Sequence, residues 1–269
     1  MSLSRTVTAA MDASINGTAD LVLSIAPASD HTLAQESLEV LVDGSAMLFD
    51  EVAGPAGARF HVARGLPVGR LTVTYSATIE GQVAPQRVTP LDEIEFVRPS
   101  RYCDADRLLA CARAELGQVA GLDLLIEATR WVGENLTYVS GSSRPVDSAL
   151  DTYLTRQGVC RDYAHLLITF LRAYNVPARL VSVYAPGLSP MDFHAIVEAV
   201  HEGTWWALDA TGLAPRAHMA RIATGSDTAD TAFMTVTRGL VELHTVEVTA
   251  VLHGQDLAVD DPTGLVTLA

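Results

Sequence analysis

Cysteine is scarce in this chain of 269 residues, which has only three, at positions 103, 111 and 160. A chain of this length can bury a core large enough to fold without crosslinks, and an odd number of thiols cannot all pair within one molecule. A disulfide framework is therefore a poor explanation of these residues. We expect reduced thiols.

Basic residues are also few, since 18 Lys and Arg stand against 32 Asp and Glu and give a formal net charge of -14. Such a charge repels polyphosphates, so we expect no nucleic-acid partner. No apolar run approaches the roughly 18 residues that span a bilayer, and the first residues lack a basic start followed by an apolar core. We therefore expect a cytoplasmic protein with no membrane partner.

The first 97 residues consist of short segments rich in Val, Thr and Leu, separated by Gly, Pro or Asp. This rhythm is typical of an antiparallel β-sandwich. The clearest strand is predicted at residues 70–79, where apolar and polar residues alternate with period two. The sequence predicts a β-sandwich domain over residues 1–97.

Beyond a boundary near Val97, the pattern predicts helices at residues 104–116 and 122–136 and a third from Cys160 to Tyr174. Strands are expected in the segments ARLVSVYAP, FHAIVEAV, WWALDAT and GLVELHTVEVTAVLHG. Helices and strands thus mix after the sandwich, and we assign residues 98–269 to a second, α+β domain.

Cys160 is the residue that points to chemistry. A thiol is nucleophilic as a thiolate, which the N-terminus of a helix and a neighbouring imidazolium both favour. The sequence QGVC enters the third helix through a glycine, which lets the chain turn sharply there. The first N–H groups of that helix could also hold an oxyanion. The simpler interpretation of one cysteine on an apolar face is a small buried hydrophobe.

His194 and Asp209 lie on the two strands of a predicted hairpin with a polar turn at residues 201–203. If the residue numbers of opposed positions sum to 403, His194 faces Asp209 across a four-residue loop, and the two side chains point to the same side. A loop centred nearer Gly203 would instead place His194 opposite residue 211. In the first register Asp209 could orient His194 toward a thiol. Taken singly, a surface histidine and a turn aspartate are the simpler interpretations.

The segments QGVCRDYAHLLITFLRAYNVPARLVSVY, FHAIVEA and WWALDAT together resemble the core of the transglutaminase-like superfamily in order and in spacing. The β-rich start and RPSRYCDADRL narrow the resemblance to bacterial transglutaminase-like proteins described as candidate cysteine proteases. It implies a papain/transglutaminase-like α+β core in which the nucleophile begins a helix packed on an antiparallel sheet. By position, Cys160 would be the nucleophile, His194 the general base and then acid, and Asp209 the residue that orients it.

The resemblance implies a cysteine protease or amidase that acts on a peptide or amide substrate through a thioester, without cofactor or metal. Alternatives are a glutamine transamidase or deamidase, a non-enzymatic interaction module with a vestigial cleft, and a zinc site made of Cys, His and Asp. Many relatives have Trp soon after the histidine and Pro after the aspartate, where this chain has Ile196 and Ala210. These departures concern the wall of the cleft rather than the triad.

The remaining candidates have simpler roles. We expect Cys103 and Cys111 to be structural thiols packed under the β-domain, and His165 to be solvated or bonded to a neighbouring side chain. One of Trp205 and Trp206 should fill the core. Further expectations place His201 in the hairpin turn and keep Tyr102 and Gln157 as conceivable oxyanion or cleft residues.

Overall fold

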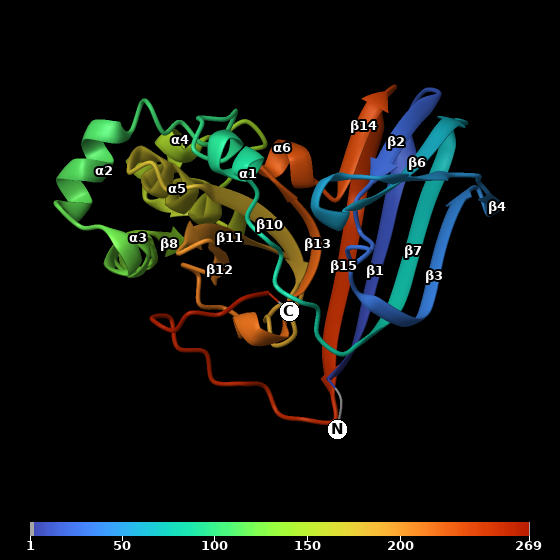
Figure 1. The fold of residues 1–269 in the computed structure, drawn as a ribbon. Helices are drawn as coiled ribbons and strands as arrows, with labels where there is room; N and C mark the ends of the chain where they lie inside the picture. The colour runs from blue at the N-terminus through green and yellow to red at the C-terminus, as the bar shows by residue number, and fades with distance from the viewer. Residues whose placement is uncertain (1–2, 269) are drawn as a thin grey trace.

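The computed structural model describes residues 3–268 and consists of a β-sandwich beside a helical unit built on a second sheet (Figure 1). It is a mixed α+β protein with mostly antiparallel sheets, which confirms the expected fold class. Within residues 3–268 no helix is long and apolar enough to cross a membrane.

The sandwich has one sheet of five strands in the order β15-β1-β7-β3-β4 and one of four in the order β14-β2-β6-β5. The predicted strand at residues 70–79 is part of β7, and its five apolar residues are all buried, so its alternation places one face in the core. The strands of the sandwich are β1 (Ser4–Ile15), β2 (Ala19–Leu23), β3 (Thr32–Val42), β4 (Ser45–Ala46), β5 (Asp50–Ala53), β6 (Arg59–Leu66), β7 (Gly69–Glu80), β14 (Met234–Arg238) and β15 (Val241–His253).

The expected domain boundary assigned all of residues 98–269 to the second domain, but strands β14 and β15 belong to the sandwich. β15 pairs with β1 along its whole length, and β14 pairs with β2. The sandwich is therefore completed by the returning C-terminal part of the chain. The apolar alternation of this segment identifies a strand, but it carries no information on which distant strand is its partner.

The second unit has a four-stranded antiparallel sheet in the order β12-β11-β10-β13, with helices α2 to α5 on one side and the sandwich on the other (Figure 1). Its strands are β10 (Ala178–Tyr184), β11 (Phe193–His201), β12 (Thr204–Leu208) and β13 (Ala220–Gly225), and two short strands, β8 (Thr137–Tyr138) and β9 (Gln157–Gly158), pair in parallel. Its helices are α1 (Pro90–Glu95), α2 (Leu109–Leu116), α3 (Gly121–Asn135), α4 (Ala149–Thr155), α5 (Cys160–Ala173) and α6 (Thr228–Thr231). The three predicted helices correspond to α2, α3 and α5, whereas β13 had no predicted counterpart.

The two units share a buried boundary. The Tyr184 hydroxyl on β10 donates to the Ile25 carbonyl of the sandwich at 2.8 Å, and both residues are fully buried. The Ala28 amide donates to the Arg221 carbonyl on β13 at 2.9 Å. Apolar residues of β10 and β13 also belong to the same hydrophobic cluster as the sandwich core. The sandwich therefore supports the sheet that carries the candidate site.

Candidate functional site

Cys160 is the first residue of α5, as the sequence predicted. Val159 precedes it in extended conformation, and its amide donates to the Asp162 carboxylate at 2.8 Å. This carboxylate caps the first turn and complements the positive end of the helix dipole. The Cys160 side chain is only partly buried, so its thiol lies at the surface of the helix start rather than inside the core.

Gly158 is required at the approach to α5 for a reason that differs from the expected sharp turn. A Cβ atom on Gly158 would lie 2.5 Å from the Asp162 Cβ, and atoms in real structures do not approach so closely. The glycine sits in the short strand β9, where its carbonyl accepts from the Val139 amide at 3.0 Å. It therefore makes room for the capping carboxylate that fixes the helix start.

His194 and Asp209 are joined by a hydrogen bond of 2.8 Å between His194 Nε2 and Asp209 Oδ2. Both side chains are almost completely buried, with 1% and 2% exposed. The other carboxylate oxygen, Oδ1, accepts from the Thr211 amide and hydroxyl at 2.9 Å and 2.7 Å. Asp209 is thus also the turn aspartate of the simpler interpretation, and the turn aims its second oxygen at the imidazole.

The register that places His194 opposite Asp209 is wrong, and the alternative register, with a turn nearer Gly203 that would place His194 opposite residue 211, is the one observed. Val197 pairs with Leu208 and His201 with Thr204, so opposed residue numbers sum to 405, and the turn is the pair Glu202 and Gly203. Both turn residues have positive φ, 50° and 72°, as in the type I′ turn that closes most two-residue hairpins. Asp209 lies one residue beyond β12 and reaches His194 from the turn that follows, not across a strand pair.

The electrostatics around His194 favour its protonated form. Burial by itself lowers the pKa of this imidazole, but the charge and hydrogen bond of Asp209 and contact with the Cys160 thiol outweigh burial and raise the pKa to about 10. The pKa of Asp209 is lowered, because His194 and Thr211 more than offset the effect of burial. At neutral pH the buried pair is therefore an imidazolium and a carboxylate.

Tyr138, on β8, is a site residue that the sequence did not single out. Its side chain lies close to Cys160 at the start of α5. Burial, followed by the negative charge of Cys160, raises the pKa of Tyr138 to about 12. The parallel pairing of Tyr138 with Gly158 brings the ring to the start of α5. No signal in the sequence predicts this pairing, because β8 and β9 have only two residues each.

A cavity opens beside Cys160 and His194, with a volume of about 190 Å³. It lies between the second sheet and the sandwich, since Leu180 and Ile222 come from the sheet and Ser24 follows β2. Its wall is mostly apolar and includes Phe193 and Phe233, whose rings stack with centroids 5.2 Å apart. A group bound in this cavity would lie beside the thiol.

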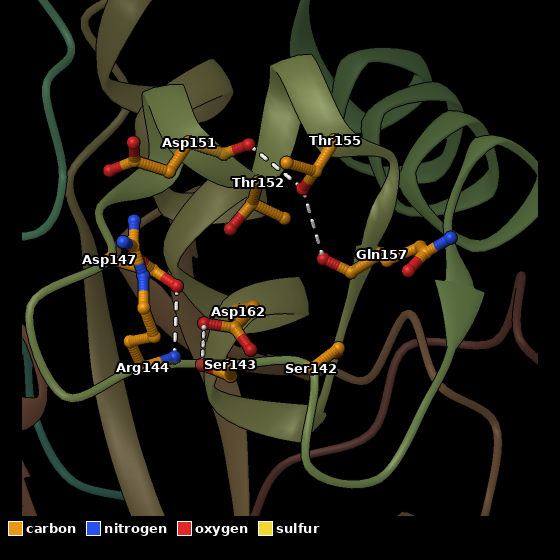
Figure 2. A pocket seen from close by; sticks show the side chains of 9 residues that line it. All are labelled: Ser142, Ser143, Arg144, Asp147, Asp151, Thr152, Thr155, Gln157 and Asp162. Carbon is orange, nitrogen blue, oxygen red and sulfur yellow. Dashed lines mark hydrogen bonds and ion pairs between the residues drawn. The ribbon is translucent and has the colours of Figure 1, made fainter.

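Tyr102 and Gln157 do not line the cavity beside Cys160. The Tyr102 hydroxyl donates to the Pro145 carbonyl at 3.0 Å. Figure 2 shows Gln157 in a separate polar hollow between α4 and the loop at residues 142–147, where Asp162 is turned toward Ser143.

The two tryptophans also lie outside this cavity. Trp205 is buried in the core, as expected for one of the pair, and the Arg179 guanidinium stacks on its ring at 4.0 Å. Trp206 is partly buried, and its indole N–H donates to the His201 carbonyl at 3.1 Å. His201 is the last strand residue before the hairpin turn, rather than part of the turn.

The other thiols and His165 have structural surroundings. Cys103 is buried among the helices rather than under the β-domain, and burial raises its pKa to about 12. His165 is completely buried, so the expectation that it is solvated is wrong, whereas a bond to a neighbouring side chain is present at 2.8 Å to the Thr228 hydroxyl. Burial lowers the pKa of His165 to about 3 and keeps it neutral. Cys111 is partly buried on α2.

The described part of the chain contains no set of side chains that could hold a metal ion. Among residues 3–268 no group of three or more His, Cys, Asp or Glu side chains is arranged to hold an ion. The zinc alternative therefore has no structural support there.

Comparison with known proteins indicates the family of this chain. A family model described as the transglutaminase-like superfamily matches residues 111–210, which include Cys160, His194 and Asp209. A crystal structure of a protein from Cytophaga hutchinsonii, described as a candidate cysteine protease, is 30% identical and superposes with a TM-score of 0.86. That similarity covers 96% of this chain and 93% of the other.

A second relative is an uncharacterised protein of Mycobacterium leprae, strain TN, which is 28% identical over 170 residues. The match covers 54% of this chain and 59% of that protein, so the chain spans less than two thirds of its length. Two findings indicate the same family. They are the near-complete overlap with the Cytophaga hutchinsonii protein and the match to the family model. The chain therefore belongs to the transglutaminase-like superfamily.

Proposed function

We propose that this protein is a cysteine protease or amidase that cleaves peptide or other amide bonds by thiol acyl transfer. Cys160 is the nucleophile, His194 transfers the protons, and Asp209 orients the imidazole. One observation carries the proposal: His194 Nε2 is held by Asp209 at 2.8 Å while the imidazole also contacts the thiol at the start of α5. This is the arrangement of nucleophile, base and orienting group that covalent catalysis requires.

In the reactive form of the proposed pair, His194 is an imidazolium and Cys160 is a thiolate, since a neighbouring imidazolium stabilises a thiolate. The Cys160 sulfur attacks the carbonyl carbon, and the carbonyl π electrons move to oxygen. When the carbon–oxygen double bond re-forms, the carbon–nitrogen bond breaks, and His194 gives its proton to the departing nitrogen. An amine leaves and a thioester remains on Cys160.

Neutral His194 then takes a proton from water, and the resulting hydroxide attacks the thioester carbon. Collapse of this second tetrahedral species expels the thiolate and releases a carboxylic acid. His194 is again protonated, so the cycle closes without a redox partner. Asp209 stays ionised throughout and stabilises the imidazolium.

The oxyanion of both tetrahedral species needs hydrogen-bond donors near the thiol. The Cys160 backbone N–H, in the first turn of α5, is one. The Tyr138 side chain also lies close to Cys160, so a substrate oxyanion beside the thiol can accept from both the N–H and the Tyr138 hydroxyl. We assign Tyr138 as the second donor on this basis.

The first test measures alkylation of Cys160 by iodoacetamide as a function of pH, with intact-protein and peptide mass spectrometry. A Cys111→Ser background removes the other partly exposed thiol, and Cys103 is buried. We expect rapid alkylation at and below neutral pH that is lost in His194→Ala, because the imidazolium holds the thiolate. Equal alkylation with and without the histidine would contradict the proposal and favour a binding module.

The second test identifies the acceptor of the acyl group. Wild-type protein and Cys160→Ala are incubated with a library of fluorogenic peptide amides, with and without an excess of a primary amine. Release of free acid in both conditions indicates a protease or amidase. Transfer of the acyl group to the amine would instead indicate a transamidase, and no turnover by wild type would argue against an enzyme.

A further inference from the structure

The cavity beside Cys160 is built by both structural units. Phe193 and Ala195 come from β11 of the second unit, and Phe233 lies directly before β14 of the sandwich. Its volume of about 190 Å³ lies below the roughly 300–1,000 Å³ of pockets for drug-sized ligands. The cavity therefore suits a single side chain. Because it borders both Cys160 and His194, it is a subsite for a group close to the reacting carbonyl of the proposed reaction.

The side chains on the sheet side of this cavity open onto it. β10 and β11 are the two inner strands of the second sheet, yet their residues Ser182, Phe193 and Ala195 are partly exposed, and all three line the cavity. Phe193 and Ala195 are two residues apart on β11, so their side chains point to the same side of the sheet. Ser182 is paired with Ala195 and points to that side as well. The small side chains of Ser182 and Ala195 leave a hollow that Phe193 borders.

The surface that this cavity offers to a ligand is largely apolar. Phe193, Ala195 and Phe233 are partly exposed hydrocarbon side chains, and the two rings stack with centroids 5.2 Å apart. The Ser182 hydroxyl donates to the Ala223 carbonyl at 3.4 Å, so it already has a partner within the protein. Exposed apolar surface of this kind is stabilised when the apolar atoms of a ligand cover it.

The charges around the cavity do not favour an ion inside it. The charged side chains that line it are Asp192, Arg161 and His194. Arg161 is bonded to the Asp162 carboxylate and His194 to that of Asp209, so both cations already have counter-ions. Asp192 is exposed, so an ion pair with it would be solvated and would add little. A carboxylate or an ammonium group in the cavity would therefore lose hydration without adequate compensation.

We propose that this cavity selects an acyl donor with a bulky apolar side chain, such as Leu or Phe, close to the scissile amide. That side chain fills the hollow over Ala195 and contacts the rings of Phe193 and Phe233, while the carbonyl carbon lies beside the thiol. Ala195 and Phe233 are thus specificity-determining residues, the first because it is small and the second because it is large and apolar. This inference rests on the proposed thiol acyl transfer and adds its substrate class.

The test uses the full-length protein with the Cys111→Ser change and a series of dipeptidyl chloromethyl ketones. These compounds place a peptide side chain next to an electrophilic carbon, from which the Cys160 thiolate displaces chloride, so the test needs no turnover. Leu, Phe, Glu, Lys or Gly occupies each of the two positions before the ketone in turn, with Ala at the other. Intact-protein mass spectrometry follows the modification, and peptide mass spectrometry locates it at Cys160.

Each second-order rate constant is divided by that for iodoacetamide, which carries no side chain and corrects for the reactivity of the thiol in each variant. At one of the two positions we expect the Leu or Phe compound to react about 10- to 100-fold faster than the Gly, Glu and Lys compounds. This is the range expected for burial of one large apolar side chain.

Ala195→Leu and Phe233→Ala test the two selecting residues separately. Ala195→Leu fills the hollow, so the preference for Leu or Phe over Gly should disappear. Phe233→Ala removes part of the apolar wall and should lower that preference about 3- to 10-fold. Ala10→Leu is the matched control, because Ala10 is also a partly exposed strand residue but lies on β1 and does not line the cavity. Its preference should equal that of wild type.

Melting temperatures and iodoacetamide rates show whether each variant is folded with a reactive thiol. If Ala195→Leu does not fold, the side-chain series in wild type and Phe233→Ala still decides. Labelling that depends on His194 but not on the peptide side chain, a preference for Glu or Lys, or an apolar preference that the folded variants retain would overturn the inference alone. Equal iodoacetamide rates with and without His194 would overturn the proposed function and the inference with it.

Discussion

Replacing Asp209 with asparagine tests the pair that orients the candidate base. The change keeps the shape of the side chain and removes the charge that faces His194 Nε2 at 2.8 Å. Burial lowers the pKa of His194, and without the carboxylate only the Cys160 thiol opposes burial, so we expect the pKa to fall well below its value of about 10. One pKa unit corresponds to about 1.4 kcal/mol, so the imidazolium loses several kcal/mol of stabilisation.

The same change predicts how stability depends on pH. The pKa of His194 is raised by folding, so its contribution is fully present below the unfolded value of about 6.5 and is lost as the pH rises through about 10. The pKa of Asp209 is lowered, so its contribution is present above the unfolded value of about 4 and is lost as the pH falls. The pair therefore stabilises the protein most between about pH 4 and 6.5.

Urea unfolding at about pH 6 and about pH 11, on either side of the His194 pKa, measures this contribution. We expect Asp209→Asn to be clearly destabilised at the lower pH and close to wild type at the higher one. In wild type we expect kcat/KM to decline on the alkaline side near pH 10, where His194 loses its proton. In Asp209→Asn we expect kcat/KM to be about 100- to 10,000-fold lower than in wild type. Asp256→Asn, at an exposed position, controls for the loss of one negative charge. Equal destabilisation at both pH values would refute the reasoning.

Three further changes test the surroundings of the thiol and the boundary between the units. Tyr138→Phe removes the proposed second oxyanion donor and should lower kcat about 100-fold with little change in KM or melting temperature, whereas a higher kcat would show that the hydroxyl blocks the site. Gly158→Ala places a Cβ against Asp162, so the start of α5 must shift. We expect the free energy of unfolding, measured with urea, to fall by about 1–3 kcal/mol and kcat to fall as well. Unchanged activity would contradict the tight approach. Tyr184→Phe leaves the Ile25 carbonyl without its donor and should cost about 1–3 kcal/mol while unfolding stays a single transition. Two separate transitions would mean that the units do not stabilise each other.

Local patterns in the sequence were sufficient to identify the type and place of several elements, but not which of their faces are buried. The alternation in residues 70–79 and the helical period after Cys160 both correspond to observed elements. The polar face of α5 was harder to interpret, because His165 and Arg172 are buried and bonded to groups outside the helix, such as Thr228 and the Ser226 carbonyl. A polar side chain that is satisfied inside the protein has the same sequence pattern as one that faces water. The partners of such residues depend on contacts distant in sequence.

The hairpin register shows the same limit at the site itself. A two-residue type I′ turn is usually signalled by Asn-Gly or Asp-Gly, and here Glu202 adopts the left-handed conformation before Gly203. Glu202 is therefore a weak sequence signal for a two-residue turn, and the expected four-residue loop was two residues too long. His194 and Asp209 still meet, because the turn held by Thr211 brings the carboxylate back to the imidazole. Their contact could be anticipated from residue type and order, but its geometry depends on that turn.

The cavity beside Cys160 could not be predicted from the segments that carry Cys160, His194 and Asp209. Ser24 and Phe233 reach it only because β2 and β14 pair beside the second sheet, and the Ser24 amide donates to the Phe233 carbonyl at 2.9 Å. The proposed nucleophile and its base lie within one contiguous part of the chain, whereas the wall of the cavity beside them combines residues from both ends. If the proposed function holds, we expect chemistry and selectivity to be separable in this protein. Exchange of the sandwich residues should change which amide is cleaved without altering how Cys160 attacks it.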